Sequence, residues 1–170
     1  MGPEDRQFPE FFVSEYGRLR RLGFLLTGSW TEGEELAQET LVRIYWRWSL
    51  VRRQEHPEAY ARKVLVNRHR SLLRRAKVEA RHLAGRRVEE AVQPELGTDG
   101  LVLWSAVRRL PDRQRAVLVL RYHEDLPEAE VARLLGLPLG TVKSLAHRGL
   151  ARLRGELGSP AMEEIRGNLE

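Results

Sequence analysis

Apolar residues recur every three or four positions along most of this 170-residue chain. In the first such segment, from Phe8 to Thr27, this period places apolar side chains on one face of a helix, and Gly28 follows as a stop signal. No segment shows the alternation of apolar and polar residues that a half-buried strand requires. The sequence therefore predicts an all-α fold.

Two further helices are predicted before residue 78. The second begins at Thr31, because its hydroxyl and the carboxylate of Glu34 have the spacing of a capping box, T-x-x-E. The apolar face of this helix comprises Ala37, Leu41, Ile44 and Trp48. The third begins at His56 and Pro57, because proline suits the first helical position, and it is predicted to run to about Lys77.

The chain is predicted to form two small helical domains. Pro, Gly, Thr and Asp collect between Gln93 and Gly100, a composition that ends helices and keeps a linker solvated. We expect a first domain over residues 6–77, a flexible linker over 78–98, a second domain over 99–158 and a tail over 159–170. The second domain is predicted to contain four short helices over residues 101–110, 113–122, 128–135 and 141–156.

The last two of these helices have the pattern of a helix-turn-helix. Ala132 is small where the two helices must cross, and Gly136 supplies the positive φ of a tight turn without a Cβ clash. Val142 is expected to anchor the second helix on the first through Val131 and Leu135. An αα-hairpin with a solvated basic face is the alternative interpretation.

The outward face of the final helix is expected to contact duplex DNA, because it carries hydroxyl and basic side chains suited to base edges and phosphates in a major groove. The predicted contacts are Thr141, Lys143, Ser144, His147, Arg148 and Arg152. Leu145 is assigned to the same outward face.

An acidic patch is predicted on the second helix. Glu35, Gln38 and Glu39 share one face, and four glutamates and no basic residue occur from Thr31 to Glu39. Acidic residues near a helix N-terminus complement the helix dipole, which is one explanation of the patch. Docking to a basic protein surface is the other.

The third helix is strongly basic, with seven Lys or Arg residues and no acidic residue from Ala59 to Val78. Uncompensated charges of one sign repel each other unless an anion is bound, so nucleic acid is the expected ligand. The basic stripe consists of Lys63, Asn67, Arg70, Arg74 and Lys77. The stripe expected to be buried consists of Ala61, Leu65, Leu72 and Ala76.

Aromatic residues flank the turn before this basic helix. Trp46, Trp48 and Tyr60 are placed where unstacked bases could be held against aromatic rings. Packing in the core is the alternative for Trp48, which is assigned to the apolar face of the second helix.

Composition excludes several other classes of protein. Lys and Arg number 29 against 24 Asp and Glu, for a formal net charge of +5, which fits a polyanionic partner. No long apolar run or signal peptide is present, so a soluble cytoplasmic protein without membrane insertion is expected. With no cysteine and no ligand-spaced histidine cluster, no metal or cofactor is expected.

These motifs together resemble conserved regions 2 and 4 of extracytoplasmic-function RNA polymerase sigma factors, and are similar to an actinobacterial SigE-like subgroup. The resemblance rests on the acidic motif E-L-x-Q-E, on the basic helix with Asn67, and on a G-T-V-K-S stretch beginning at Gly140, and it spans residues 8–157. It implies a transcription initiation factor that binds core RNA polymerase and promoter DNA and is not an enzyme.

The resemblance also implies roles for single residues. Binding to the clamp coiled coil of the polymerase β′ subunit is implied for Glu35, Leu36, Gln38 and Glu39. Binding to the minus-10 element is implied for Trp48, Tyr60, Lys63, Asn67, Arg70 and Arg74, with Asn67 at the position associated with a flipped-out base. The helix-turn-helix would read the minus-35 element, and its preceding helices would contact the β flap. An anti-sigma factor is a further partner that membership of the family would allow.

One departure from the family pattern concerns the recognition helix, because the family usually carries arginine at the position of Leu145. Two other classes of function also fit parts of the chain. A dimeric helix-turn-helix regulator explains the C-terminal half but not residues 31–77. A nucleic-acid enzyme with Glu34, Glu35 and Glu39 as metal ligands lacks a convergent partner residue.

Overall fold

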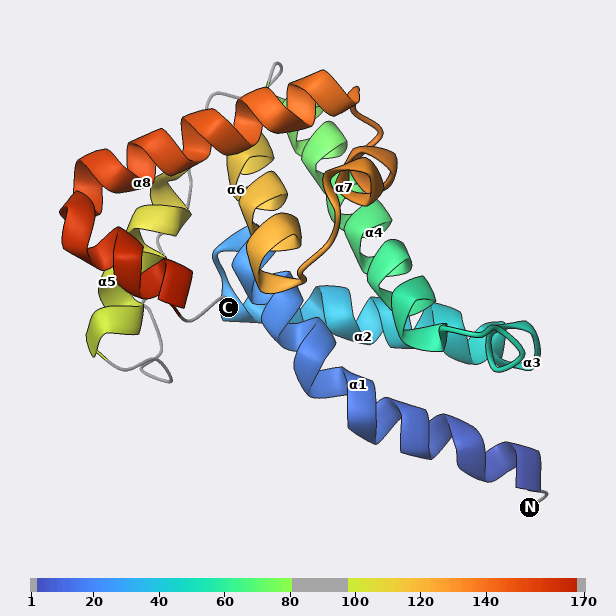
Figure 1. The fold of residues 1–170 in the computed structure, drawn as a ribbon. Coiled ribbons are helices and arrows are strands. Elements are labelled where there is room, and N and C mark those ends of the chain that lie inside the picture. Colours follow the sequence, from blue (N-terminus) through green and yellow to red (C-terminus); the bar gives the residue numbers. More distant parts are fainter. Residues whose placement is uncertain (1–2, 81–97, 168–170) are drawn as a thin grey trace. The chain divides into compact units, whose positions relative to one another are not determined.

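The computed structural model describes residues 3–80 and 98–167, and the side chains of residues 7–80 and 102–158 (Figure 1). Within these ranges every regular element is a helix and no strand occurs, which confirms the predicted all-α fold. The chain divides into two compact units, Met1–Ala91 and Val92–Glu170. Most of the predicted linker lies outside the described residues.

The first unit contains four helices in its described part: α1 (Pro3–Thr27), α2 (Trp30–Trp46), the short α3 (Trp48–Val51) and α4 (Pro57–Ala80). Helices α1 and α2 pack against each other along much of their length, and α4 packs against both. The largest fully buried side chains of this core are Leu22, Leu26, Leu36, Leu41, Ile44, Val51, Leu65 and Val66. Burial of these apolar groups is the main stabilising contribution to the unit.

The turn between α1 and α2 corrects the predicted start of the second helix. Gly28 has a φ of 85°, which ends α1. Ser29 then has the extended conformation that a capping residue requires, and its hydroxyl accepts a hydrogen bond from the amide of Glu32. Thr31 already lies inside the helix and is exposed, so the predicted capping box of Thr31 does not form.

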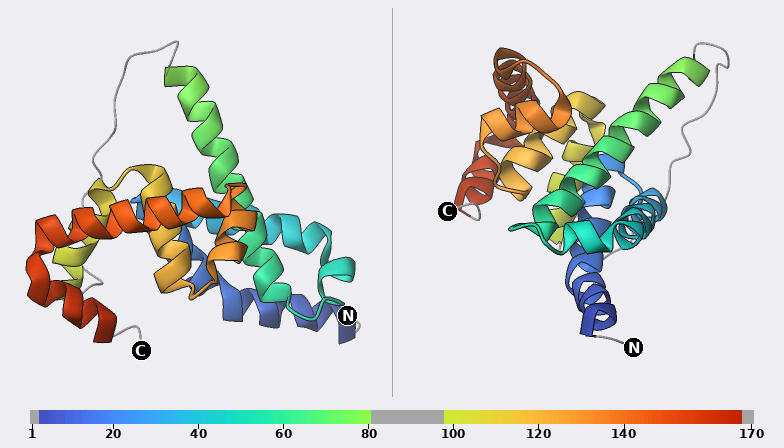
Figure 2. Two further views of the ribbon diagram at one scale, coloured as in Figure 1. Left: turned by 45° about the horizontal axis from the view of Figure 1, so that its top comes forward. Right: turned by 90° about the vertical axis from the view of Figure 1, so that its right-hand side faces the viewer.

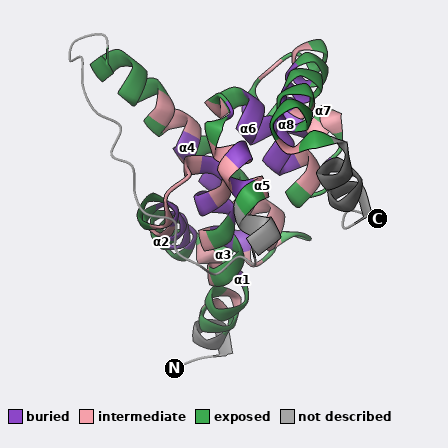
Figure 3. Cartoon of the chain, turned by 90° about the vertical axis from the view of Figure 1, so that its left-hand side faces the viewer, coloured by how far each residue is buried: buried purple, intermediate pink, exposed green. Residues whose placement is uncertain are grey.

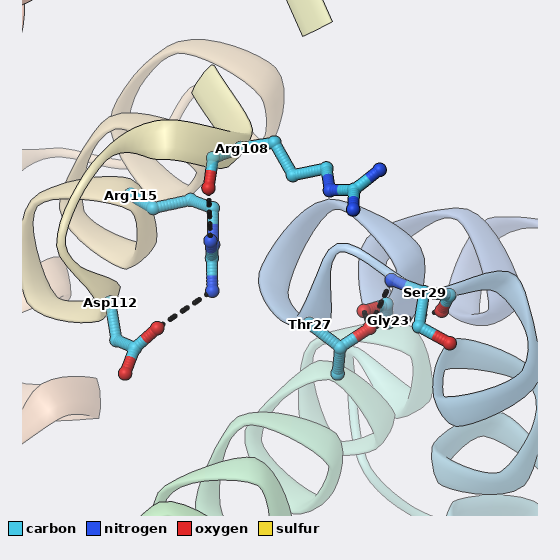
Figure 4. Close-up of polar contacts among 6 residues, drawn as sticks. All are labelled: Gly23, Thr27, Ser29, Arg108, Asp112 and Arg115. Atoms are coloured by element: carbon cyan, nitrogen blue, oxygen red, sulfur yellow. Dashed lines mark hydrogen bonds and ion pairs between the residues drawn. The ribbon is translucent and has the colours of Figure 1, made fainter. Parts of the chain in front are cut away.

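A second hydrogen-bonded residue closes this turn. The hydroxyl of Thr27 donates to the carbonyl of Gly23 at 2.9 Å and accepts from the amide of Ser29 at 3.2 Å (Figure 4). The turn is therefore fixed from both sides, which sets the direction in which α2 leaves α1.

Glycines allow α1 and α2 to approach closely. A Cβ atom on Gly23 would lie 2.6 Å from the carbonyl oxygen of Gly33, and one on Gly33 would lie 2.4 Å from the amide nitrogen of Phe24. Both distances are far below van der Waals contact, and both involve backbone that cannot move aside. The close packing of these two helices therefore depends on both glycines.

Helix α4 runs to Ala80 and extends beyond the other helices of its unit, as both views of Figure 2 show. Ala61 and Leu65 are buried as predicted, whereas Leu72 is 37% exposed and Ala76 is exposed. The prediction of burial was wrong for these last two residues, because no helix of the unit reaches the final turns of α4 (Figure 3).

The second unit contains α5 (Thr98–Arg109), α6 (Asp112–Leu118), the π-helical turn η1 (Val119–His123), α7 (Glu128–Leu135) and α8 (Leu139–Gly167). The predicted helix over residues 113–122 is therefore two elements, because a π-helical turn follows Leu118. Helix α8 passes the predicted end at residue 156 and continues after a non-helical Gly158. The residues expected to form a tail are helical as far as Gly167, and residues 168–170 lie outside the described part.

A buried arginine joins α5 to α6. Arg115 is only 6% exposed, and its guanidinium donates to the carbonyl of Arg108 at 3.0 Å and to the carboxylate of Asp112 at 2.8 Å (Figure 4). The charge is thus paired and hydrogen-bonded, as burial of an arginine requires. The apolar core of this unit includes Trp104, Leu110, Val117, Leu120, Val131, Val142 and Leu153. None of the helices in the described ranges is long and apolar enough to cross a membrane.

Candidate protein and nucleic-acid interfaces

The acidic face of α2 is presented to solvent. Glu35, Gln38 and Glu39 are exposed, as a docking surface requires. Leu36, in contrast, is 2% exposed and belongs to the core. This position faces the interior together with Gly33 and Thr40, so its burial argues against the implied polymerase contact by Leu36.

The edge of this face nearest α1 is held by hydrogen bonds to one carboxylate oxygen of Glu34. The hydroxyl of Tyr16 donates to this oxygen at 2.9 Å, and the amide of Gln38 donates to it at 3.3 Å. The hydrogen bond to Glu34 raises the pKa of Tyr16, and burial adds to this effect. These contacts connect α1 to α2 and restrict the side chain of Gln38.

The other edge is an ion pair that the sequence did not predict. The Nη2 of Arg68 donates to Oε1 of Glu39 at 3.2 Å, and its Nε donates to the second carboxylate oxygen. Hydrogen bonding to Arg68 lowers the pKa of Glu39 and raises the pKa of Arg68. Glu39 therefore connects α2 to α4, and its charge is partly compensated. Glu35 makes no ion pair with any residue in the described part of the chain.

The basic stripe of α4 is exposed at Lys63, Asn67, Arg74 and Lys77, whereas Arg70 is half-buried. Burial lowers the pKa of Arg70, and the neighbouring charge of Arg74 lowers it further. The guanidinium of Arg70 donates to Oδ1 of Asn67 at 3.5 Å. The arrangement gives a positively charged surface with an amide side chain at its centre, which can bind phosphates and an unpaired base edge.

Trp48 packs against α1. It lies in α3 and not on the second helix, because α2 ends at Trp46. Its ring centre is 5.4 Å from that of Phe8 and 5.2 Å from that of Phe11, and the residue is half-buried. These contacts favour the packing interpretation for Trp48. Tyr60, in the first turn of α4, is also half-buried.

The helix-turn-helix forms as predicted. Gly136 has φ 62° and ψ 41°, the left-handed conformation that a turn glycine adopts without strain. The next amide, that of Leu137, donates to the carbonyl of Ala132 at 2.9 Å. Val142 and Val131 are fully buried and Leu135 is 7% exposed, so the predicted apolar anchor between the two helices is confirmed.

The exposed surface of α8 carries most of the predicted DNA contacts: Lys143, Ser144, His147, Arg148 and Arg152. Thr141, at the first turn, is half-buried. The hydroxyl of Ser144 donates to the carbonyl of Gly140 at 3.0 Å, which leaves its lone pairs as acceptors. The guanidinium of Arg148 donates to the carbonyl of Ser144 at 3.3 Å, so this side chain lies along the helix.

Leu145 does not lie on this surface. It is 7% exposed and belongs to the buried face of α8, so its assignment to the outward face was wrong. The buried face consists of Val142, Leu145, Ala146, Gly149 and Leu153. These positions follow one another at the helical steps of three and four that bring side chains onto one face. A Cβ atom on Gly149 would lie 2.9 Å from Cδ1 of Leu118, which shows how closely α8 packs against α6.

A catalytic metal centre is not supported by the described part of the chain. No group of three or more His, Asp or Glu side chains is placed there to hold a metal ion. The carboxylates of Glu34 and Glu39 are instead engaged with Tyr16 and Arg68.

Known proteins resemble the chain over both units. The family model for Sigma-70 region 2 matches residues 11–79, and the model for Sigma-70, region 4 matches residues 101–153. An RNA polymerase sigma-E factor of Streptomyces antibioticus is 37% identical over 129 residues, which cover 74% of this chain and 71% of that protein. The corresponding factor of Streptomyces avermitilis is 33% identical over 156 residues, which cover 90% of this chain and 86% of the other.

A solved structure has the same fold. It is the sigma factor RpoE in complex with the anti-sigma factor NepR from Bartonella quintana. The TM-score is 0.74 at 22% sequence identity, and the match covers 89% of this chain and 97% of the other. At this level of identity the likeness concerns the fold alone.

Proposed function

Because the chain belongs to the sigma-70 family of RNA polymerase sigma factors, in its extracytoplasmic-function class, we propose a division of promoter recognition between its two units. As a sigma factor it binds core RNA polymerase and directs it to promoters for transcription initiation. The observation that carries the proposal is that one unit combines an acidic face on α2 with a basic face on α4. A single nucleic-acid ligand does not account for both.

The acidic face of α2 binds core polymerase in this proposal. The residues that dock on the clamp coiled coil of the β′ subunit are Glu35, Gln38 and Glu39. All three are exposed to solvent. Glu39 also holds α4 through Arg68, so the polymerase-binding and DNA-binding helices share one side-chain contact. The helices that precede the helix-turn-helix contact the β flap.

The basic face of α4 opens and reads the minus-10 element. Lys63, Arg70 and Arg74 neutralise backbone phosphates, which supplies affinity without sequence preference. Asn67 contacts a base taken out of the stack, at a cost of a few kcal/mol in unstacking that phosphate contacts offset. Tyr60, in the first turn of α4, and Trp48, in α3, support this surface.

The recognition helix α8 reads the minus-35 element as duplex DNA. Lys143, Ser144, His147, Arg148 and Arg152 are its exposed contacts, with Thr141 at the first turn. Sequence preference at this element depends on these residues and not on Leu145, because the side chain of Leu145 packs inside the unit. An anti-sigma factor is a further proposed partner, as in the complex of the Bartonella quintana protein.

The protein contributes binding energy and not catalytic groups in this proposal, and it acts in the cytoplasm where RNA polymerase is found. A simple operator-binding regulator would use the helix-turn-helix alone. Such a regulator would leave the two faces of the first unit without a ligand. No second function is proposed.

The division of labour is tested with two single variants. Asn67→Ala is expected to impair opening at the minus-10 element, read by permanganate reactivity of unpaired thymines, while binding to core polymerase stays at the wild-type level. Arg148→Ala is expected to weaken binding to minus-35 duplex and to leave binding to single-stranded minus-10 DNA unchanged. An equal loss of polymerase binding in either variant would contradict the proposed division.

A further inference from the structure

The outermost line of α2 changes from acidic to apolar along its length. Glu35, Glu39, Val42 and Trp46 follow one another at steps of four, three and four. At about 100° per residue they lie within an arc of about 60°, on the side of the helix opposite Ile44. The two acidic residues occupy the first half of this line, and the two apolar residues occupy the second half.

The apolar half is exposed to solvent. Val42 is 54% exposed and Trp46 is 79% exposed, and the adjacent Tyr45 is 58% exposed. Only an edge contact with Tyr45, at 6.1 Å between ring centres, is recorded for the Trp46 ring in the described structure. A surface helix ordinarily carries polar residues on this side. Packing within the described part of the first unit therefore does not explain why apolar residues occupy positions 42 and 46.

The neighbouring charges indicate the kind of partner. The carboxylate of Glu35 makes no ion pair with a residue that the structure describes, and that of Glu39 lies next along the same line. Carboxylates repel the phosphates of nucleic acid, whereas they attract basic side chains of a protein. Tryptophan is among the residues most often found at the energetic centre of protein interfaces. A protein surface with basic groups beside an apolar area would match the whole line.

We propose that Val42 and Trp46 extend the polymerase-docking face of α2, with Trp46 as its apolar anchor on core RNA polymerase. This inference rests on the proposed function, in which the acidic half of the same line docks on the polymerase. The two halves contribute differently. The acidic half accelerates association and its effect falls with added salt, whereas the apolar anchor slows dissociation and is insensitive to salt.

The test measures association and dissociation rates of the full-length protein on immobilised core RNA polymerase at two salt concentrations. Trp46→Ala is expected to weaken binding by about 30-fold or more, through faster dissociation at both salt concentrations. Trp46→Leu, which keeps an apolar side chain, is expected to retain most of the affinity. Glu35→Gln is expected to slow association at low salt only. Val13→Ala is the matched control, because Val13 is also 79% exposed but lies on α1.

Two results would overturn the inference: Trp46→Ala binds core polymerase as tightly as the wild type, or the control Val13→Ala loses as much affinity as Trp46→Ala. If Trp46→Ala keeps polymerase binding and loses affinity only for single-stranded promoter DNA, Trp46 is assigned to nucleic acid. Helical content measured by circular dichroism should match the wild type in each variant, since the altered side chains are exposed. If the wild-type protein itself failed to bind active core polymerase, the proposed function would fail first.

Discussion

Replacement of Leu145 by alanine tests the placement of this residue inside the second unit. Leu145 is 7% exposed and lies in the buried face of α8. Loss of a buried leucine side chain costs about 2 to 5 kcal/mol, because the apolar transfer energy is lost and a cavity remains. We expect about 2 to 3 kcal/mol for Leu145→Ala, at the lower end, because the side chain is not completely enclosed.

This loss is large for a unit of this size. For a domain of about 60 to 100 residues, each kcal/mol lowers Tm by roughly 4 to 8 °C, so Leu145→Ala should lower the Tm of the second unit by roughly 10 to 20 °C. Hydrogen–deuterium exchange read by mass spectrometry localises the effect, because peptides of each unit are measured separately. Peptides from α6 to α8 should lose protection, whereas peptides from α1 and α2 should not.

The control for this measurement is Ser144→Ala. Ser144 is the exposed neighbour of Leu145, and its hydroxyl donates only within its own helix, to Gly140. Its replacement should change stability by less than about 0.5 kcal/mol. Burial of Leu145 would be contradicted if Leu145→Ala left protection of the second unit unchanged and altered affinity for minus-35 duplex. That result would place Leu145 on the DNA-facing surface, as the sequence alone suggested.

Three further predictions concern single contacts. Glu39→Gln removes the ion pair with Arg68 and should lower the stability of the first unit at pH 7, measured by urea denaturation. The expected loss is only about 0.5 to 1 kcal/mol, because solvent screens the pair. The pKa of Glu39 is lowered in the fold, so this difference should be present above pH 4.5 and disappear as the pH falls through the folded pKa. Gly136→Val should lower the Tm of the second unit, because a β-branched residue is strained at φ 62°. Gly33→Ala should destabilise the first unit by about 1 to 3 kcal/mol through its clash with Phe24, whereas Gly17→Ala, with no atom near its Cβ position, should not.

The sequence predicted the elements that depend on local chemistry. The helical period, the turn glycine Gly136 and the anchor Val142 were all identified, because each requirement acts within a few residues. The start of α4 at Pro57 was also predicted, because proline suits the first turn of a helix. The prediction of the capping residue was wrong, because Ser29 and Thr31 can both act as caps and the position of Gly28 decides between them.

The predictions that were wrong depend on contacts between elements. The helical period places Leu145 near the same face of α8 as Val142. Only the packing of α8 on α6 and α7 shows that this face is the buried one. Leu72 follows Leu65 by two helical turns and so lies on the same face of α4. It is nevertheless exposed, because this part of α4 extends beyond the helices beside it. The pair of Glu39 and Arg68 joins residues 29 positions apart, and no local pattern predicts such a pair.

As a sigma factor, this protein should bind core RNA polymerase as a single copy and direct it to a promoter. The most direct measurement is size-exclusion chromatography of the purified protein mixed with active bacterial core enzyme, followed by quantification of both proteins in the complex. We expect co-elution at one-to-one stoichiometry. A protein that never co-elutes with active core enzyme, and that binds two-fold symmetric DNA as a dimer, would contradict it.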